Sequence, residues 1–161
     1  MLTLAAKLNP FQRRYCRNLV ADVDDHEMAV QPFAGANHPA WILGHLVMAA
    51  DAGLKFLGHP PTATEDYETL FGRGSQPSSD RSLYPTKAEL LAAVDKAYDQ
   101  LLQAGQAATP EQLAAPHGNN MLAKALPTVG ELLGMLLTTH VAQHLGQLSA
   151  WRRATGRPAM F

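Results

Sequence analysis

The chain has 161 residues, 47% of them hydrophobic, which is the size of one domain with enough apolar side chains to bury a core. Thirteen basic residues against 14 acidic ones give a formal net charge of -1, so the overall charge favours neither nucleic acid nor an anionic membrane as a partner. A single cysteine excludes an intramolecular disulfide and a CxxC site. The sequence also lacks an uninterrupted run of about 18 apolar residues, the length that a membrane-spanning helix needs. We therefore expect a cytoplasmic protein.

Four segments carry apolar residues at helical spacing, without an alternating run of β-branched residues, so the sequence predicts an all-α fold. The first predicted helix begins at Asn9-Pro10 and ends before Pro32. Its predicted inward residues are Phe11, Tyr15, Leu19 and Val23. The second begins at Asn37-His38-Pro39, a capping position followed by an early proline, and ends at Gly58.

Two capping boxes mark the later helices. Thr86 with Glu89 predicts the start of the third helix, which continues through LLAAVDKAYDQLLQAG and is followed by the short turn TPEQLAAP. Thr128 with Glu131 predicts the start of the fourth, a single helix that ends at Gly156. One four-helix bundle then accounts for the single predicted domain, residues 1–161.

The connection between the second and third helices, residues 58–85, is long and rich in Pro, Gly and Ser. A connection of this length in a compact domain is commonly functional or mobile, so we interpret it as a crossover that could also serve as a lid. Tyr67, Phe71 and Arg73 could close over a site, but the safer prediction is that Tyr67 and Phe71 pin the connection to the bundle.

The stretch HVAQHLGQ places two histidines four residues apart in the fourth helix. Each residue turns a helix by about 100°, so His140 and His144 lie about 40° apart on one face. That face follows the stripe Leu133, Leu136, His140, His144, Gln147 and Trp151, which predicts that both imidazoles point into the core. On the second helix, the stripe Trp41, His45, Met48, Ala52 and Phe56 turns a third imidazole inward.

Three imidazoles that converge in a bundle core predict a metal site, since facing helices commonly build such sites from inward side chains. Three nitrogen ligands leave coordination open for water or substrate, as in catalytic sites. Imidazole suits Zn, Ni, Cu or Fe, and Mn is also possible. The alternative is that each histidine is a core residue hydrogen-bonded to a carbonyl or hydroxyl group.

The sequence lacks the motifs of two other kinds of metal site, the di-iron site and the zinc-protease site. Glu-x-x-His pairs for di-iron chemistry are absent from both histidine-bearing helices. No glutamate follows His140, so the HExxH base of a zinc protease is missing. His26 could reach the core, but the polar residues around it make a metal role for it the weaker interpretation. His38, His59 and His117 lie beside Pro or Gly in predicted turns, where we expect exposure.

Three stretches carry a family resemblance. THVAQHLGQLSAWRRATGRP resembles the last helix of the DinB/YfiT-like superfamily, with its His-x-x-x-His-x-Gly-Gln run and the arginine-containing turn that follows. NHPAWILGHLVMAAD is similar to the family's second helix, with a tryptophan four residues before the histidine, and LNPFQRRYCRNLV extends the likeness into the first.

The resemblance implies an up-down-down-up four-helix bundle, frequent homodimers, and a divalent metal held by His45, His140 and His144. Gln147 matches a glutamine of the family, and Trp41 and Met48 are expected beside the site or in its pocket. Better understood relatives are transferases or isomerases that use thiols such as bacillithiol or mycothiol. We therefore expect thiol-dependent transfer or hydrolysis of a small molecule, and the alternative is a non-catalytic bundle that binds metal or ligand, or dimerises.

Overall fold

The computed structural model describes residues 2–118 and 121–160, so positions 1, 119, 120 and 161 of the predicted domain lie outside the described residues. The described part is helical, without a β-strand, and an all-α fold is confirmed. Its longer helices are α1 (Thr3–Leu19), α2 (Pro39–Phe56), α4 (Lys87–Ala107), α6 (Val129–Leu137) and α7 (Thr139–Ala154). None of the described helices is both long and apolar enough to cross a membrane.

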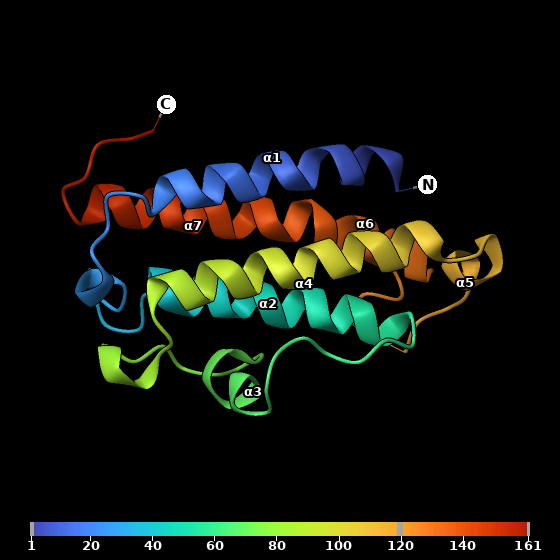
Figure 1. Ribbon diagram of the computed structural model, residues 1–161, viewed down its shortest axis with the longest axis horizontal. Coiled ribbons are helices and arrows are strands. Elements are labelled where there is room, and N and C mark those ends of the chain that lie inside the picture. The colour runs from blue at the N-terminus through green and yellow to red at the C-terminus, as the bar shows by residue number, and fades with distance from the viewer. Residues whose placement is uncertain (1, 119–120, 161) are drawn as a thin grey trace.

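The long helices lie side by side, with α1 along α6 and α7, and α2 along α4 (Figure 1). Two hydrogen bonds show that α1 runs parallel to α6 and α7: Asn9 donates to the carbonyl of Leu137 over 3.0 Å, and Arg152 donates to the carbonyl of Leu19 over 2.9 Å. The colours of Figure 1 show α2 and α4 running together in the opposite direction. This arrangement places α2 next to both α6 and α7.

The predicted capping boxes are present. Thr86 caps α4 through the N–H of Glu89, and Thr128 caps α6 through the N–H of Glu131, while each glutamate accepts from the N–H of its threonine. Four N–H groups at a helix start lack partners within the helix, and the reciprocal bonds satisfy two of them. The turn TPEQLAAP contains the short helix α5 (Pro110–Ala114).

The predicted start of the first helix is wrong, and so is the inward position of Phe11, whereas Leu19 and Val23 are fully buried as predicted and Tyr15 packs against the core. α1 begins at Thr3 and includes Pro10, and Phe11 is 53% exposed. Asn9, predicted as a cap, is fully buried in the middle of the helix and donates to the Leu137 carbonyl. This bond satisfies a polar side chain inside the core, so the face with Asn9 turns inward and Phe11 turns outward.

The predicted single fourth helix is also wrong, because it is interrupted at Thr138. The backbone there has φ -130° and ψ -77°, outside the helical range, and separates α6 from α7. The Thr138 hydroxyl donates to the Gly134 carbonyl over 2.6 Å. A threonine hydroxyl that bonds to the carbonyl four residues before it commonly bends a helix. The interruption lies two residues before His140, so both histidines of α7 belong to its first turns.

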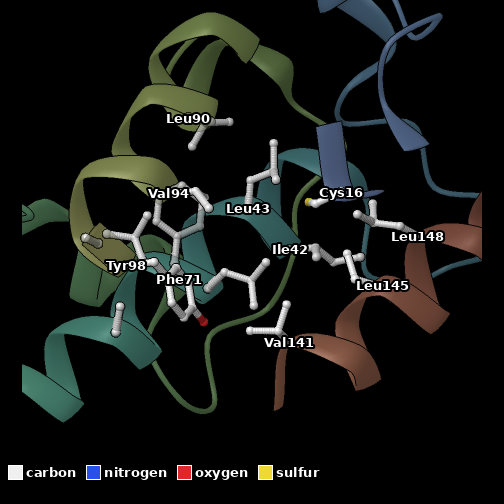
Figure 2. Packing of buried hydrophobic residues seen from close by; sticks show 14 of the residues in the cluster. Cys16, Ile42, Leu43, Phe71, Leu90, Val94, Tyr98, Val141, Leu145 and Leu148 are labelled. Carbon is white, nitrogen blue, oxygen red and sulfur yellow. The ribbon is translucent and has the colours of Figure 1, made fainter. Parts of the chain in front are cut away.

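The connection 58–85 is packed against the bundle and contains α3 (Asp66–Phe71) and a 3-10 turn (Arg81–Leu83). Phe71 is fully buried with Ile42 of α2 and Val94 of α4, as Figure 2 shows, so the prediction that Phe71 pins this connection is confirmed. Its ring lies so close to Gly44 that a Cβ there would be 2.3 Å from it. This close approach fixes the end of α3 against the first half of α2.

Candidate metal centre

Three imidazoles meet between α2 and α7. His45 comes from α2, and His140 and His144 come from α7, one turn apart. One ring nitrogen of each lies within 4.8 Å of the others, and the ring centroids are 4.6 to 5.3 Å apart. His144 is 7% exposed, whereas His45 and His140 are half-buried, so the group keeps partial contact with solvent. As the described residues form it, the group contains no cysteine and no carboxylate.

His45 is oriented by the connection 58–85. Its Nδ1 lies 2.8 Å from the backbone carbonyl of Phe71, and a carbonyl only accepts, so Nδ1 carries the proton and Nε2 carries the lone pair. Trp41 stacks on the same imidazole, with 4.7 Å between centroids and 9° between planes. The Trp41 indole donates to the hydroxyl of Ser75 over 2.9 Å. The ring therefore has a fixed tautomer and a fixed plane, as in imidazoles that bind metal.

Gln147 fixes the tautomer of His144 in the same way. Its side-chain oxygen lies 3.1 Å from Nδ1 of His144 and accepts a hydrogen bond from the N–H there, which leaves the Nε2 lone pair available. The amide of Asn37 donates to the same oxygen over 3.1 Å and holds it in place. The segment before α2 is thus connected to a histidine of α7.

His140 has a buried Nδ1 without a hydrogen-bond partner among the described residues. A buried polar atom without a partner costs about 1 to 3 kcal/mol, and proteins rarely keep one without a use. An unsatisfied imidazole next to two others with available lone pairs fits a bound cation. The ligand atoms also fit a bound metal ion, because imidazole nitrogens suit divalent transition metals.

Burial keeps the imidazoles of His140 and His144 neutral. Burial, with a smaller contribution from the neighbouring His45, lowers the pKa of His140 to about 4. Burial, together with smaller contributions from His140 and His45 and an opposing effect of the Gln147 bond, lowers the pKa of His144 to about 4. Since a protonated imidazole has no lone pair for a metal, both residues are ready to bind one at neutral pH.

The other predicted site residues have different positions. Gln147 and Trp41 contact the histidines, whereas Met48 lines a separate cavity of about 520 Å³ together with Asp51 and Glu68. His26 is exposed in the 3-10 turn before Met28 and lies outside the histidine group. The structure therefore gives His26 no part in this site.

Two histidines were expected in exposed turns and are buried, so those predictions are wrong. His38 is fully buried and caps α2: its Nδ1 accepts from the N–H of Trp41, and its Nε2 donates to the carbonyl of Ser78 over 2.9 Å. Burial lowers its pKa to about 4. His117 is 7% exposed and packs against Phe56. Pro39 begins the helix as predicted, but His38 before it is the buried cap of α2 and does not lie in an exposed turn.

Sequence reasoning named Gln147 and Trp41 but missed the other groups that orient the imidazoles. Asn37 was expected to cap α2, but His38 takes that position and Asn37 bonds to Gln147 instead. The carbonyl of Phe71 had no signal in the sequence, since every residue has a carbonyl. The hydroxyl of Ser75 lies in a Gly- and Ser-rich segment where no single residue stood out.

Fold and site together define a class of protein: an all-α bundle whose facing helices hold three histidines that could bind a metal ion. A family model for the DinB superfamily matches residues 11–148. The chain therefore belongs to the DinB superfamily, and the matched range includes all three histidines. A search of curated proteins finds none that matches.

Proposed function

We propose that this protein is a metal-dependent enzyme of the up-down-down-up bundle type, and that it catalyses thiol-dependent transfer on a small molecule. The observation that supports this proposal is the group of His45, His140 and His144, whose ligand atoms lie within 4.8 Å of one another. We propose a divalent ion, Zn, Ni, Fe or Mn, as the occupant. Three ligands from the protein leave a coordination position for a substrate atom, as catalytic sites require.

When bound, the metal would lower the pKa of a thiol or water ligand, so that a nucleophile exists at neutral pH. The chain supplies the geometry. The Phe71 carbonyl and the Gln147 oxygen keep the protons of two imidazoles on Nδ1, and the Trp41 ring covers one face of His45. Because these contacts exist before a substrate arrives, little reorganisation is needed on binding.

Hydrolysis is the second activity at the same site. A hydrolase of this kind commonly uses a carboxylate as general base, and the described histidine group contains none. A thiol held as thiolate attacks without such a base, so the observed residues favour transfer over hydrolysis. A non-catalytic site would use a fourth protein ligand to close the coordination sphere.

The first experiment measures bound metal by mass spectrometry on protein purified without a histidine tag. The variants are His45→Ala, His140→Ala and His144→Ala, and His26→Ala is the matched control because His26 is exposed and outside the group. We expect near-stoichiometric metal in the wild type and the control, and loss in the three variants. Absence of metal in wild-type protein, also after loading with Zn, Ni, Mn or Fe, would refute the proposal.

The second experiment follows conjugation of a low-molecular-weight thiol to a small electrophile, with hydrolysis of an ester measured in parallel. We expect conjugation that depends on added metal and is lost in His144→Ala but not in His26→Ala. Metal binding without either activity would support the non-catalytic alternative instead. The homodimer is part of the same proposal, and sedimentation velocity tests it directly.

A further inference from the structure

A cavity of about 360 Å³ lies beside the histidines, between the segment 31–37 and α7. Its volume falls within the range of about 300 to 1,000 Å³ that small-molecule sites occupy. The lining residues come from these two parts of the chain and are Pro32, Phe33, Gly35, Ala36, Asn37, Gln147, Ala150, Trp151 and Ala154.

None of the described residues that line the cavity has a charged side chain. Two aromatic rings and several small apolar groups face the cavity, and the amides of Asn37 and Gln147 are its polar groups. The nearby guanidinium of Arg157, 5.2 Å from the centroid of the Trp151 ring, is paired with the carboxylate of Glu27 over 2.6 Å. A carboxylate or phosphate would therefore find no unpaired cation among the described residues at the cavity, and burying a charge without a partner is costly. The cavity therefore fits a neutral, largely apolar group, and about 150 Å³ of apolar space is enough for a benzene ring.

Gln147 belongs to both the cavity and the histidine group. Its side-chain oxygen accepts from Nδ1 of His144, and the same side chain lines the cavity. Ala150 follows on α7, six residues beyond His144, which is a rise of about 9 Å along the helix. A ligand in the cavity thus lies within the length of a small molecule from the imidazoles.

The walls of the cavity are held in place without a ligand. The Trp151 indole donates to the Val30 carbonyl over 2.7 Å, so its ring cannot turn away without loss of this partly buried bond. Gln31 donates to the carbonyls of Ala36 and Pro77 over 3.0 and 3.1 Å, which closes the segment into a turn. Gly35 has φ 77° in this turn, a conformation that favours glycine.

We propose that this cavity binds a neutral aryl or alkyl group of the substrate, so that the reacting atom of the same molecule reaches the three histidines. This inference rests on the proposed function and names the substrate class: a small uncharged molecule with an apolar group a few bonds from a thiol or an electrophilic centre. Phe33, 69% exposed at the mouth, would be covered when such a group enters.

The test uses cobalt-loaded protein and a series of thiols: ethanethiol, benzyl mercaptan, 3-phenylpropane-1-thiol and 3-mercaptopropionate. The absorption of the cobalt–sulfur bond reports binding without any turnover. Of the two phenyl thiols, we expect the one with the higher affinity to bind at least about tenfold more tightly than ethanethiol and 3-mercaptopropionate, because burial of a phenyl ring favours binding by at least this factor.

Ala150→Phe fills the cavity from an exposed position on α7, and Ala142→Phe is the matched control, an exposed alanine of the same helix that does not line it. We expect Ala150→Phe to lose the preference for phenyl thiols while it keeps its cobalt and its affinity for ethanethiol. Ala154→Phe, at another exposed lining position, provides a second variant if the first folds poorly.

A second measurement needs no metal. In the NMR spectrum of metal-free protein, 3-phenylpropan-1-ol should shift the Trp151 indole resonance, and 3-phenylpropionate should do so much less. Equal binding of all thiols, a preference that persists in both filled variants, or an unmoved indole resonance would overturn the cavity proposal. Failure to retain any metal would instead refute the proposed function, while the NMR result would still decide what the cavity binds.

Discussion

Replacement of Gln147 by methionine tests whether the histidine geometry is set by its neighbours. The substitution keeps the length of the side chain but removes the oxygen that accepts from Nδ1 of His144. Loss of an outer hydrogen bond to a metal-binding histidine typically lowers metal affinity by 10- to 100-fold. Gln147 is exposed, so water can replace its oxygen in part, and we expect the lower limit, about tenfold or about 1.4 kcal/mol.

The assay is competition for zinc between the protein and a chromophoric chelator at pH 7. Gln143→Met is the matched control, since Gln143 is exposed one turn earlier on the same helix and belongs to neither the histidine group nor the cavity. We expect its zinc affinity to equal that of the wild type. If Gln147→Met also bound zinc with wild-type affinity, the contact would have no role in orienting His144, and the reasoning would be wrong.

Three further predictions concern packing and protonation. Gly44→Ala should destabilise the protein by about 1 to 3 kcal/mol in urea, because its Cβ would lie 2.3 Å from the Phe71 ring, whereas Gly146→Ala, with open space around its Cβ, should stabilise it by about 0.5 to 1 kcal/mol. Equal effects of the two substitutions would contradict this account of the contact. Burial lowers the pKa of His38 to about 4, below an unfolded value near 6.5, so its contribution to stability is complete above pH 6.5 and is lost as the pH falls toward 4. Metal-free wild type should therefore lose about 2 to 3 kcal/mol more than His38→Asn over this range in urea titrations, and parallel curves would refute this prediction. Burial raises the pKa of the Cys16 thiol to about 12, so dithionitrobenzoate should react with it only after unfolding, and fast reaction in native buffer would argue against this burial.

Local signals in the sequence predicted much of the fold. A capping box needs only a threonine and a glutamate three residues later, so the starts of α4 and α6 follow from neighbours in the chain. The approach of His45 to His140 and His144 followed from helical periodicity together with the requirement that apolar stripes face one another. Both kinds of signal depend on spacing along one helix.

Features decided by contacts between distant residues were not predictable in this way. Asn9 resembles a helix cap before a proline, yet its bond to the Leu137 carbonyl places it inside the core. Thr138 resembles an ordinary helical residue, yet its hydroxyl bonds to the carbonyl of Gly134 and its own carbonyl accepts from the side chain of Gln12 in α1 over 3.1 Å. Both features thus involve a hydrogen bond from α1 to the end of α6, and the sequence does not show which side chain will make such a distant bond.

The connection 58–85 explains why a site can be visible in a sequence while its support is not. The imidazole of His45 is recognisable by type and spacing, but its proton is held by the backbone carbonyl of Phe71, and the residue type at that position does not specify this contact. What specifies it is the burial of the Phe71 ring against Gly44, which brings the carbonyl to the histidine. A core contact therefore positions a functional group, and substitutions of Gly44 should alter metal binding as well as stability.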